Sequence, residues 1–203
     1  DVTECGYKMV SKNKPVSCHS FHNGIYYNFD NILPRIKKCF VWIRLWRSDF
    51  LKKNSLQFYN GIYFEDILFV IQAAYYAKSW NIISYVGYNY RIVPTSSTND
   101  PKKRDKRDND LFIVLENLYS FAKKVGIIKD NVKNKQDIFY KFLYQNCVSK
   151  NKVLDNHCYQ TYLKIFGKNP ALIKLRRKVF IQRYFRLSLK KKKIVLFGFN
   201  LWK

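Results

Sequence analysis

Hydrophobic residues in the first half of the chain follow two different spacings, one typical of strands and one typical of helices. Alternation over residues 1–10 predicts a strand that ends near Tyr7, and two short strands are predicted at residues 82–86 and 88–92, on either side of a glycine. Residues 41–46 form an apolar run, which we interpret as a short buried strand or extended segment. This part of the chain is therefore expected to be α/β.

Apolar residues at helical spacing predict three helices between these strands. The most regular one begins at Glu65 and extends to about residue 78. Its apolar positions are Ile67, Leu68, Ile71, Ala74 and Tyr75. An earlier helix is expected to be capped by Asp30 or Asn31, and a brief helix is expected over residues 47–53.

Beyond residue 100 the pattern becomes predominantly helical. The predicted helices cover residues 111–125, 136–148, 155–166 and 170–189, and the first of them is ended by Gly126. We therefore divide the chain into an α/β region, a helical extension that ends in a basic helix, and a basic lead-in to a terminal strand. These three parts are residues 1–100, 101–189 and 190–203.

Composition and charge restrict the possible classes of protein. The chain is 47% hydrophobic and 18% aromatic, which is too apolar for a disordered protein. It has 38 basic and 14 acidic residues, and no acid follows Asp155. Such a charge attracts nucleic acid, acidic lipid headgroups or the phosphates of a nucleotide-sugar. An AT-rich coding sequence also enriches Lys, Asn, Ile, Phe and Tyr together, so coding bias stays open as the source of much of the lysine.

Cysteine usage and hydropathy bear on the compartment. The five cysteines are odd in number and lack the spacing of a disulfide framework, which favours a reducing compartment. Cys18, His19 and His22 could form part of a zinc site, but no second pair completes it, so no metal site is predicted in this chain. No stretch approaches the ~18 to 20 apolar residues of a membrane span. We expect a cytoplasmic protein, with attachment to the inner face of the membrane through residues 170–193 left open.

The adjacent carboxylates Glu65 and Asp66 are the strongest candidate for chemistry. They follow a glycine-containing turn and open an apolar helix in a chain that has few acids. Acids at this position stabilise free N–H groups and the positive end of the helix dipole. A carboxylate there could also act as a general base that takes a proton from a hydroxyl. The two interpretations are compatible.

Four segments, in this order along the chain, resemble family 2 glycosyltransferases. They are residues 41–54 (VWIRLWRSDFLKKN), residues 61–66 (GIYFED), residues 88–91 (YNYR) and residues 96–98 (SST). The resemblance implies the GT-A fold, and it places residues 1–100 in the C-terminal half of that catalytic domain. The expected fold class is therefore α/β: a partial GT-A (nucleotide-diphospho-sugar transferase-like) domain without its N-terminal half, followed by a helical C-terminal extension.

The same resemblance implies roles for individual residues. Asp66 matches the general base, with Glu65 beside it as a supporting or acceptor-binding group. The guanidinium of Arg91 suits a diphosphate. Arg44 stands where the family often has Lys, and Trp46 stands where Tyr is common. The residues at expected substrate-binding positions are Arg91, Arg44, Trp46, Tyr90, Ser97 and Thr98.

The implied reaction is an inverting transfer from a nucleotide-sugar to a hydroxyl of a glycan or lipid-linked acceptor, in the synthesis of cell-surface polysaccharide. Family members hold a divalent cation, Mn²⁺ or Mg²⁺, through spaced aspartates upstream. The triplet Asp108-Asn109-Asp110 is the nearest match here, and we interpret it as a helix N-cap. The cation is therefore expected through upstream residues in a full-length enzyme and not through this chain, and the 203-residue chain alone is expected to be inactive.

Two other functions compete with this one. The net charge of +24 and the abundant aromatic residues would suit a basic nucleic-acid-binding module without catalysis. No standard nucleic-acid motif accompanies them, so nucleic acid is not the expected partner. Residues 170–193 interleave basic and apolar residues, which would suit attachment to an anionic membrane surface. Packing of this helix on the domain, with its basic groups in solvent, is the alternative.

Overall fold

The computed structural model forms two compact units, residues 1–151 and residues 152–203. The residues that it describes are 1–12, 14–93, 96, 100–128, 139–143, 161, 164–165, 195–196 and 199–200. In the second unit, strands β6 (Val195–Leu196) and β7 (Phe199–Asn200) pair as an antiparallel hairpin. The division predicted near residue 100 stays a prediction.

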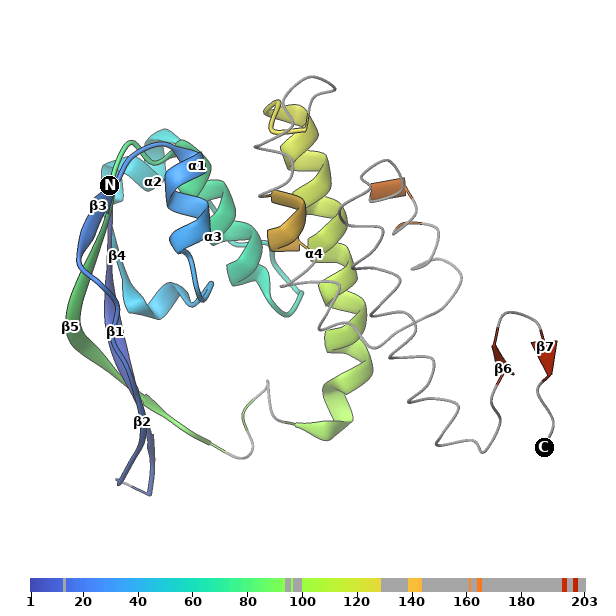
Figure 1. Cartoon of the computed structure of the whole chain (residues 1–203), viewed down its shortest axis with the longest axis horizontal. Coiled ribbons are helices and arrows are strands. Elements are labelled where there is room, and N and C mark those ends of the chain that lie inside the picture. The colour runs from blue at the N-terminus through green and yellow to red at the C-terminus, as the bar shows by residue number, and fades with distance from the viewer. Residues whose placement is uncertain are drawn as a thin grey trace. The chain divides into compact units, whose positions relative to one another are not determined.

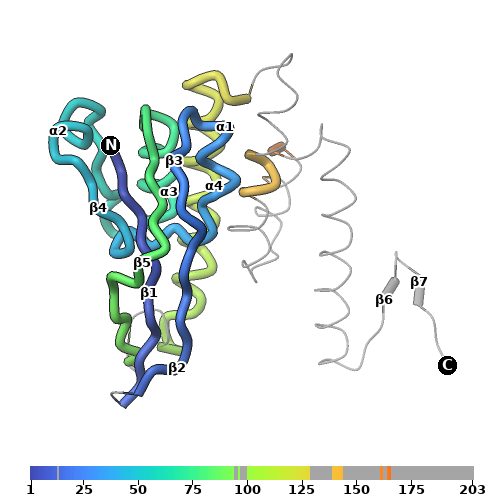
Figure 2. Tube along the Cα trace, turned by 60° about the vertical axis from the view of Figure 1, so that its left-hand side comes forward, coloured from blue at the N-terminus to red at the C-terminus, as the bar shows by residue number. Residues whose placement is uncertain are grey.

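The first unit contains a five-stranded sheet (Figures 1 and 2). Its strands are β1 (Val2–Ser11), β2 (Lys14–His19), β3 (Gly24–Tyr26), β4 (Arg44–Trp46) and β5 (Trp80–Arg91). The order is β2-β1-β5-β3, and β4 pairs with β1 on the same side as β2 does, but farther toward the start of β1. β5 is parallel to β1, and the other three pairings are antiparallel. The sheet is therefore mixed, and the α/β class is confirmed.

The strand predicted at the start of the chain is the centre of this sheet. β1 pairs with β5 along most of its length, while β4 and β2 occupy successive parts of its other edge. Its inward positions Val2, Glu4 and Gly6 are buried, and the residues between them are half-buried. A parallel neighbour needs a long crossover connection, and here the whole segment between β1 and β5 supplies it. This segment carries the candidate carboxylates.

The two short strands predicted around Gly87 are in fact the single strand β5, so that prediction was wrong. Its register against β1 shifts twice: once between the pairs Glu4–Ile82 and Gly6–Val86, and again between Gly6–Val86 and Tyr7–Tyr88. The extra residues on β5 interrupt the alternation of side chains, and an interrupted alternation resembles a break between two strands. A Cβ atom at Gly87 would approach Cys5 Sγ to 3.0 Å, so the glycine suits the irregular part of the strand.

Four α-helices and three 3₁₀ turns of the first unit have their bounds described. The α-helices are α1 (Phe29–Ile32), α2 (Ser48–Lys53), α3 (Glu65–Tyr76) and α4 (Arg104–Lys124). The 3₁₀ turns are η1 (Leu33–Arg35), η2 (Val41–Ile43) and η3 (Pro101–Lys103). Residues 139–143 are also helical. They lie inside the helix predicted over residues 136–148, whereas the basic helix predicted over residues 170–189 lies outside the described residues.

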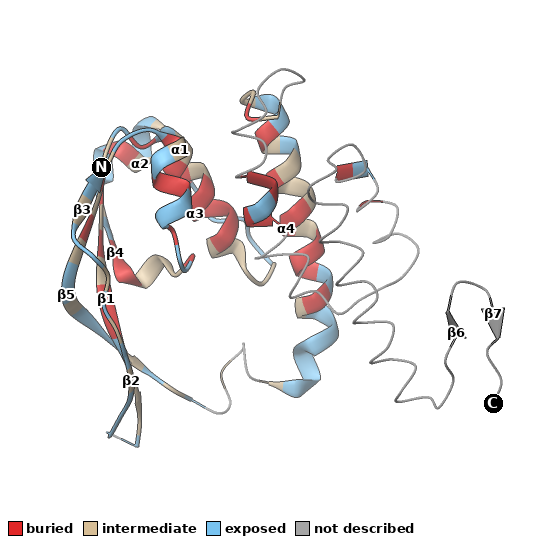
Figure 3. Cartoon of the chain, viewed as in Figure 1, coloured by how far each residue is buried: buried red, intermediate tan, exposed pale blue. Residues whose placement is uncertain are grey.

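Helix α3 occupies the middle of the unit. α1 and α3 lie on one face of the sheet, and α4 packs against α3 (Figure 1). α3 is buried on most sides, and Ala73 and Ala74 have no exposed surface. A helix that is apolar nearly all round is typical of such an interior position. Figure 3 shows the buried residues concentrated along α3, the middle of α4 and the adjoining part of the sheet, while α4 begins exposed.

The prediction for α3 is confirmed at its first residue, and α2 is confirmed within one residue at its start. Three local predictions were wrong, one of them only in part. The helix expected to be capped by Asp30 or Asn31 begins at Phe29 after Asn28, with no side-chain capping bond. The strand or extended segment expected over residues 41–46 is confirmed at residues 44–46, which form β4, whereas residues 41–43 form a 3₁₀ turn. α4 begins seven residues before the predicted 111, because its charged first turns lack an apolar stripe.

Helices α2 and α4 end in the same backbone motif. In α2, Leu56 N–H donates to Leu51 O at 3.1 Å and Ser55 N–H donates to Lys52 O at 3.1 Å. In α4, Ile127 N–H donates to Ala122 O at 2.9 Å and Gly126 N–H donates to Lys123 O at 3.3 Å. The left-handed residues of the two motifs are Ser55 and Gly126. Both pairs of bonds have the pattern of the Schellman motif, in which the residue after the C-cap is usually glycine. The predicted end of α4 at Gly126 is confirmed.

We expect Ser55→Gly to stabilise the protein by about 0.5–1 kcal/mol. Ser55 is exposed and has a φ of 50°, a conformation that a side chain disfavours and that glycine adopts freely. The measurement is the free energy of unfolding in urea. Ser55→Ala, which keeps the Cβ atom, should give no gain. A loss of stability in Ser55→Gly would show that the serine hydroxyl matters more than the backbone conformation.

The search for membrane-spanning segments covered the described residues. None of their helices has the length and hydropathy that crossing a bilayer requires.

Candidate active site

The carboxylate pair lies at the start of α3. Glu65 and Asp66 are the first two residues of the helix, and both are half-buried. The residue before them, Phe64, has a left-handed conformation with φ of 64°. This conformation costs a bulky residue about 1–2 kcal/mol, and such strain is typical of functional sites. The strained residue therefore sets the direction in which the chain enters the helix that carries the pair.

Two side chains of α4 hold the turn that leads to Phe64. The carboxylate of Asp110 accepts a hydrogen bond from Tyr63 N–H at 2.8 Å. The ammonium of Lys106 donates to Gly61 O at 2.9 Å and forms an ion pair with Asp110 Oδ2 at 2.7 Å. The same ammonium lies 5.2 Å from the centre of the Tyr63 ring. We call Lys106 and Asp110 the α4 clamp.

The interpretation of Asp108-Asn109-Asp110 as a helix N-cap was wrong. α4 begins at Arg104, so the triplet lies in its second turn. The capping side chain at this end is Asp100, which accepts from Lys102 N–H at 3.0 Å, at the start of the 3₁₀ turn that precedes the helix. Asp108 and Asp110 are instead buried, with 9% and 4% of their surfaces exposed. The sequence indicates a helix start here because acids favour both caps and first turns.

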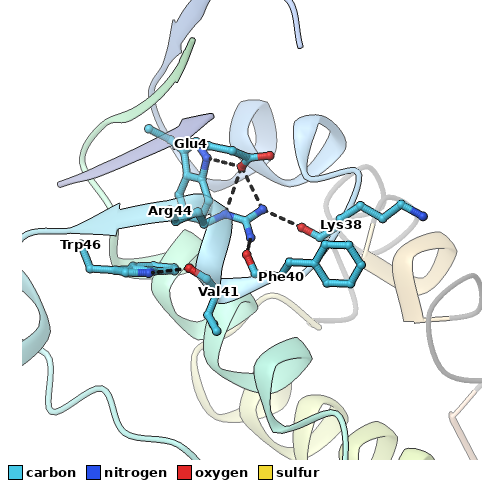
Figure 4. A network of polar contacts seen from close by, with 7 residues as sticks. Glu4, Lys38, Phe40, Val41, Arg44 and Trp46 are labelled. Carbon is cyan, nitrogen blue, oxygen red and sulfur yellow. Dashed lines mark hydrogen bonds and ion pairs between the residues drawn. The ribbon is translucent and has the colours of Figure 1, made fainter. Parts of the chain in front are cut away.

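Arg44, which we expected to bind substrate, lies in the core (Figure 4). Its guanidinium forms an ion pair with Glu4, through Nε at 3.0 Å and Nη2 at 2.8 Å from Oε2. Nη1 donates to Phe40 O at 2.5 Å, and Nη2 also donates to Lys38 O at 2.6 Å. The side chain has no exposed surface and its donors serve the fold. The substrate-binding prediction for Arg44 is therefore wrong.

The partner of Arg44 is a residue that the sequence analysis missed. Glu4 is fully buried on β1, and its Oε2 atom also accepts from Trp80 Nε1 at 3.0 Å. Oε1 is the buried side-chain oxygen without a hydrogen-bond partner among the described residues. A signal was present in the sequence, because Glu4 is a charged residue at an inward position of an alternating strand. An inward acid on a central strand requires a buried cation.

Trp46 has packing contacts that account for most of its surface. The indole Nε1 donates to Val41 O at 3.2 Å. The ring meets Phe69 of α3 and Trp80 of β5 edge-on, at centroid distances of 5.1 and 5.9 Å. Trp46 thus helps to join β4, α3 and β5. Its contact with substrate stays a prediction.

Tyr90 belongs to a cluster of aromatic rings against the sheet. The Tyr90 ring stacks on Trp42 at a centroid distance of 5.0 Å, and Trp42 also stacks on Phe40 at a centroid distance of 4.8 Å. Tyr7 meets Trp42 edge-on at 5.2 Å and stacks on His19 at 4.6 Å. Burial raises the pKa of the Tyr7 hydroxyl above its usual value. Tyr90 is half-buried in this arrangement, so part of its ring is open to solvent.

The remaining predicted site residues are Arg91, Ser97 and Thr98. Arg91 is exposed at the last position of β5, opposite Val10 in the register. Ser97 and Thr98 lie outside the described residues. The structure therefore brings Glu65 and Asp66 close to the turn held by α4, while Arg44 and Tyr90 make their contacts in the core and in the aromatic cluster.

A pocket lies at the opposite end of α3. Its lining residues come from the chain start, α2 and the end of α3: Asp1, Arg47, Asp49, Phe50, Lys53, Asn54, Tyr76 and Lys78. Twelve residues of helix separate the two ends of α3 by about 18 Å. This pocket is therefore separate from the carboxylate pair.

The divalent cation implied by the resemblance does not fit the side chains that the structure describes. Among those residues, no group of three or more His, Cys, Asp or Glu side chains could hold a metal ion. The adjacent carboxylates of Glu65 and Asp66 fall short of a ligand set for Mg²⁺ or Mn²⁺. No step of the chemistry proposed below uses a cation held by these residues.

Similarity to known proteins was found among solved structures. No protein-family model and no curated protein matches the chain. The chain is similar to the crystal structure of S. aureus TarS 1–349, at 15% sequence identity and a TM-score of 0.44. The match covers 98% of this chain and 61% of the TarS chain, so this chain spans less than two thirds of that structure. The similarity is too low to establish a shared fold, and we draw no conclusion from it.

Proposed function

We propose that the first unit is the acceptor-side part of a family 2 glycosyltransferase catalytic domain of the GT-A type. The observation that supports this proposal most is the carboxylate pair Glu65-Asp66 at the first turn of α3, behind the strained residue Phe64. The pair belongs to the ordered set of segments that resembles this family. A simple helix cap would not explain why the turn before the pair is held by a buried aspartate.

Asp66 is the general base in this proposal. The acceptor hydroxyl attacks the anomeric carbon of the nucleotide-sugar from the face opposite the diphosphate, which inverts the configuration. The new C–O bond forms as the bond to the diphosphate oxygen breaks, and the hydroxyl proton passes to the Asp66 carboxylate. The partial positive charge at the start of α3 favours the ionised form that a base requires. Glu65 orients the acceptor beside it.

Arg91 serves the donor side. An exposed guanidinium at the end of β5 is free of the core contacts that occupy Arg44, and it can present paired donors to a diphosphate. Trp46, Tyr90, Ser97 and Thr98 are proposed contacts to the two sugars. The nucleotide and its divalent cation are assigned to residues other than those described here. The acceptor is a glycan or lipid-linked glycan of the cell surface, and residues 170–193 are a proposed contact to an anionic membrane.

The test is a transfer assay with the protein as its gene encodes it. Labelled nucleotide-sugars are supplied one at a time with Mg²⁺ or Mn²⁺ and an extract of lipid-linked glycans, and the release of nucleoside diphosphate is measured. We expect release that depends on the acceptor, and a product whose anomeric configuration by NMR is opposite to that of the donor. Retained configuration would exclude the single displacement. Absence of transfer from every donor, together with steeply salt-dependent binding to duplex DNA, would favour the nucleic-acid-binding alternative.

A further inference from the structure

The α4 clamp holds both ends of a three-residue turn. Lys106 bonds the carbonyl of Gly61, and Asp110 bonds the amide of Tyr63, so the backbone is tied to α4 on either side of residue 62. The ion pair between Lys106 and Asp110 joins the two attachments into one unit. The residues lie 45 and 47 positions apart from their partners in the chain. These contacts are therefore tertiary.

The burial of Asp110 makes this contact specific. Its side chain is 6% exposed, and the carboxylate oxygen Oδ2 receives both the Tyr63 amide and the Lys106 ammonium. A buried carboxylate is stable only when such donors satisfy it. Lys106 is about half exposed, so its ammonium reaches the carboxylate from the solvent side. Together they tie the turn that precedes α3 to α4 through polar contacts.

The turn that the clamp holds continues directly into the strained residue. Phe64 follows Tyr63, and its carbonyl accepts from Ile67 N–H at 3.0 Å inside the first turn of α3. The left-handed conformation of Phe64 is thus held by α4 on one side and by the helix on the other. A bulky residue keeps such a conformation only where the surroundings determine it. Without the clamp the turn can relax, and the first residues of α3 rotate with it.

We propose that Lys106 and Asp110 are positioning residues for the carboxylate pair: by fixing the turn of residues 61–63, they keep Phe64 left-handed and aim Glu65 and Asp66 at the acceptor. The proposal rests on the function proposed above for Asp66. General-base catalysis requires the base within hydrogen-bond reach of the proton, and a displacement of about 1 Å can cost roughly 100-fold in rate. α4 therefore belongs to the catalytic domain in function, although the segments that resemble the family end before it.

The test uses three variants and a matched control in the full protein. Asp110→Ala removes both attachments of the carboxylate, Asp110→Asn keeps an acceptor for Tyr63 N–H but removes the charge, and Lys106→Met removes the ammonium. Lys103→Met is the control, since Lys103 is an exposed lysine one turn away with the same change of charge. Hydrogen exchange of the amides of residues 61–67 is measured beside kcat and KM for transfer.

We expect Asp110→Ala to speed exchange at the Tyr63 amide at least about 10-fold and to lower kcat roughly 100-fold with little change in the donor KM. Asp110→Asn should show a smaller rise in exchange and a smaller fall in kcat. The effects of Lys106→Met should be smaller than those of the two Asp110 variants and larger than those of the Lys103→Met control. Unfolding curves establish that each variant is folded under the assay conditions. Where Asp110→Ala is too unstable to assay, Asp110→Asn and Lys106→Met carry the test.

The exchange measurement separates this inference from the proposed function. One outcome is that the wild-type protein transfers no sugar while the variants exchange the Tyr63 amide faster. That result would overturn the proposed glycosyltransferase function, and with it the role of Lys106 and Asp110 in catalysis, but the clamp would remain as a structural contact. Normal kcat in folded Asp110→Ala and Lys106→Met, in a protein whose wild type is active, would overturn the clamp as a positioning device. A loss of kcat with unchanged exchange would also overturn it, because the turn would then not have moved.

Discussion

Asp66→Asn is expected to reduce sugar transfer by about 10²- to 10⁴-fold, the range over which a positioned general base contributes to rate. The amide has nearly the shape of the carboxylate but cannot accept the hydroxyl proton. The loss should appear in kcat, because the base acts in the transition state and the donor is bound by other groups. Donor affinity, measured by calorimetry with the nucleotide-sugar, should be nearly unchanged.

Position at a helix start offers an alternative explanation, and Asp49 provides a matched control for it. Asp49 lies in the first turn of α2 as Asp66 lies in the first turn of α3. The loss of a charge from a first turn destabilises a protein by about 0.3–1 kcal/mol. Asp49→Asn should therefore lower stability slightly and leave sugar transfer unchanged.

Glu65→Gln should raise KM for the acceptor more than it lowers kcat, because Glu65 is proposed to orient the acceptor.

Near-normal turnover of Asp66→Asn, with only a small loss of stability, would remove Asp66 as the base and leave the pair as a capping feature. Inactivity of both Asp66→Asn and Asp49→Asn would point to general disruption of the fold. Circular dichroism and the urea midpoint distinguish that outcome from a chemical effect.

Arg44→Met is expected to destabilise the protein by about 3–5 kcal/mol, the range reported for breaking a buried ion pair by removal of one partner. The substitution would leave the fully buried Glu4 carboxylate without its cation, and the carbonyls of Lys38 and Phe40 without their donors. The hydrogen bond from Trp80 Nε1 cannot replace a positive charge. Since a domain is stabilised by about 5–15 kcal/mol in total, this loss would be severe.

The double variant Glu4→Leu/Arg44→Met separates the ion pair from its surroundings. Apolar residues of similar volume often replace a buried pair without loss, so the double variant should recover much of the stability lost in Arg44→Met. Arg35→Met is the control: Arg35 is exposed, with its guanidinium 4.9 Å from the ring of Tyr26, and a loss of about 1 kcal/mol or less is expected. Unfolding in guanidinium chloride, followed by circular dichroism, provides the free energies.

A change below about 1 kcal/mol in Arg44→Met would contradict the buried network and return Arg44 to the list of candidate substrate-binding residues. Transfer activity provides an independent readout. If the network is structural, variants that remain folded at the assay temperature should bind the donor with unchanged affinity.

The local pattern of residues was sufficient for several elements of this fold. The alternation at the start of the chain predicted the central strand β1, although β1 continues to Ser11, past the end expected near Tyr7, and helical spacing predicted α3 beginning at Glu65. Gly126 correctly marked the end of α4. These features depend on neighbours within one or two turns, through side-chain periodicity and the φ preference of glycine, so the sequence suffices for them.

The buried polar contacts of the core and of the turn before the candidate site depend on partners far apart in the chain. Glu4 meets Arg44 after 40 positions and Trp80 after 76, and Asp110 meets Tyr63 after 47. A charged side chain looks the same in a sequence whether it meets solvent, a substrate or a buried partner. Its surroundings depend on how β1, β4, β5 and α4 come together in space. For this reason the carboxylate pair could be located from the sequence alone, whereas the burial of Arg44 and the attachment of the turn to α4 emerged only from the packed fold.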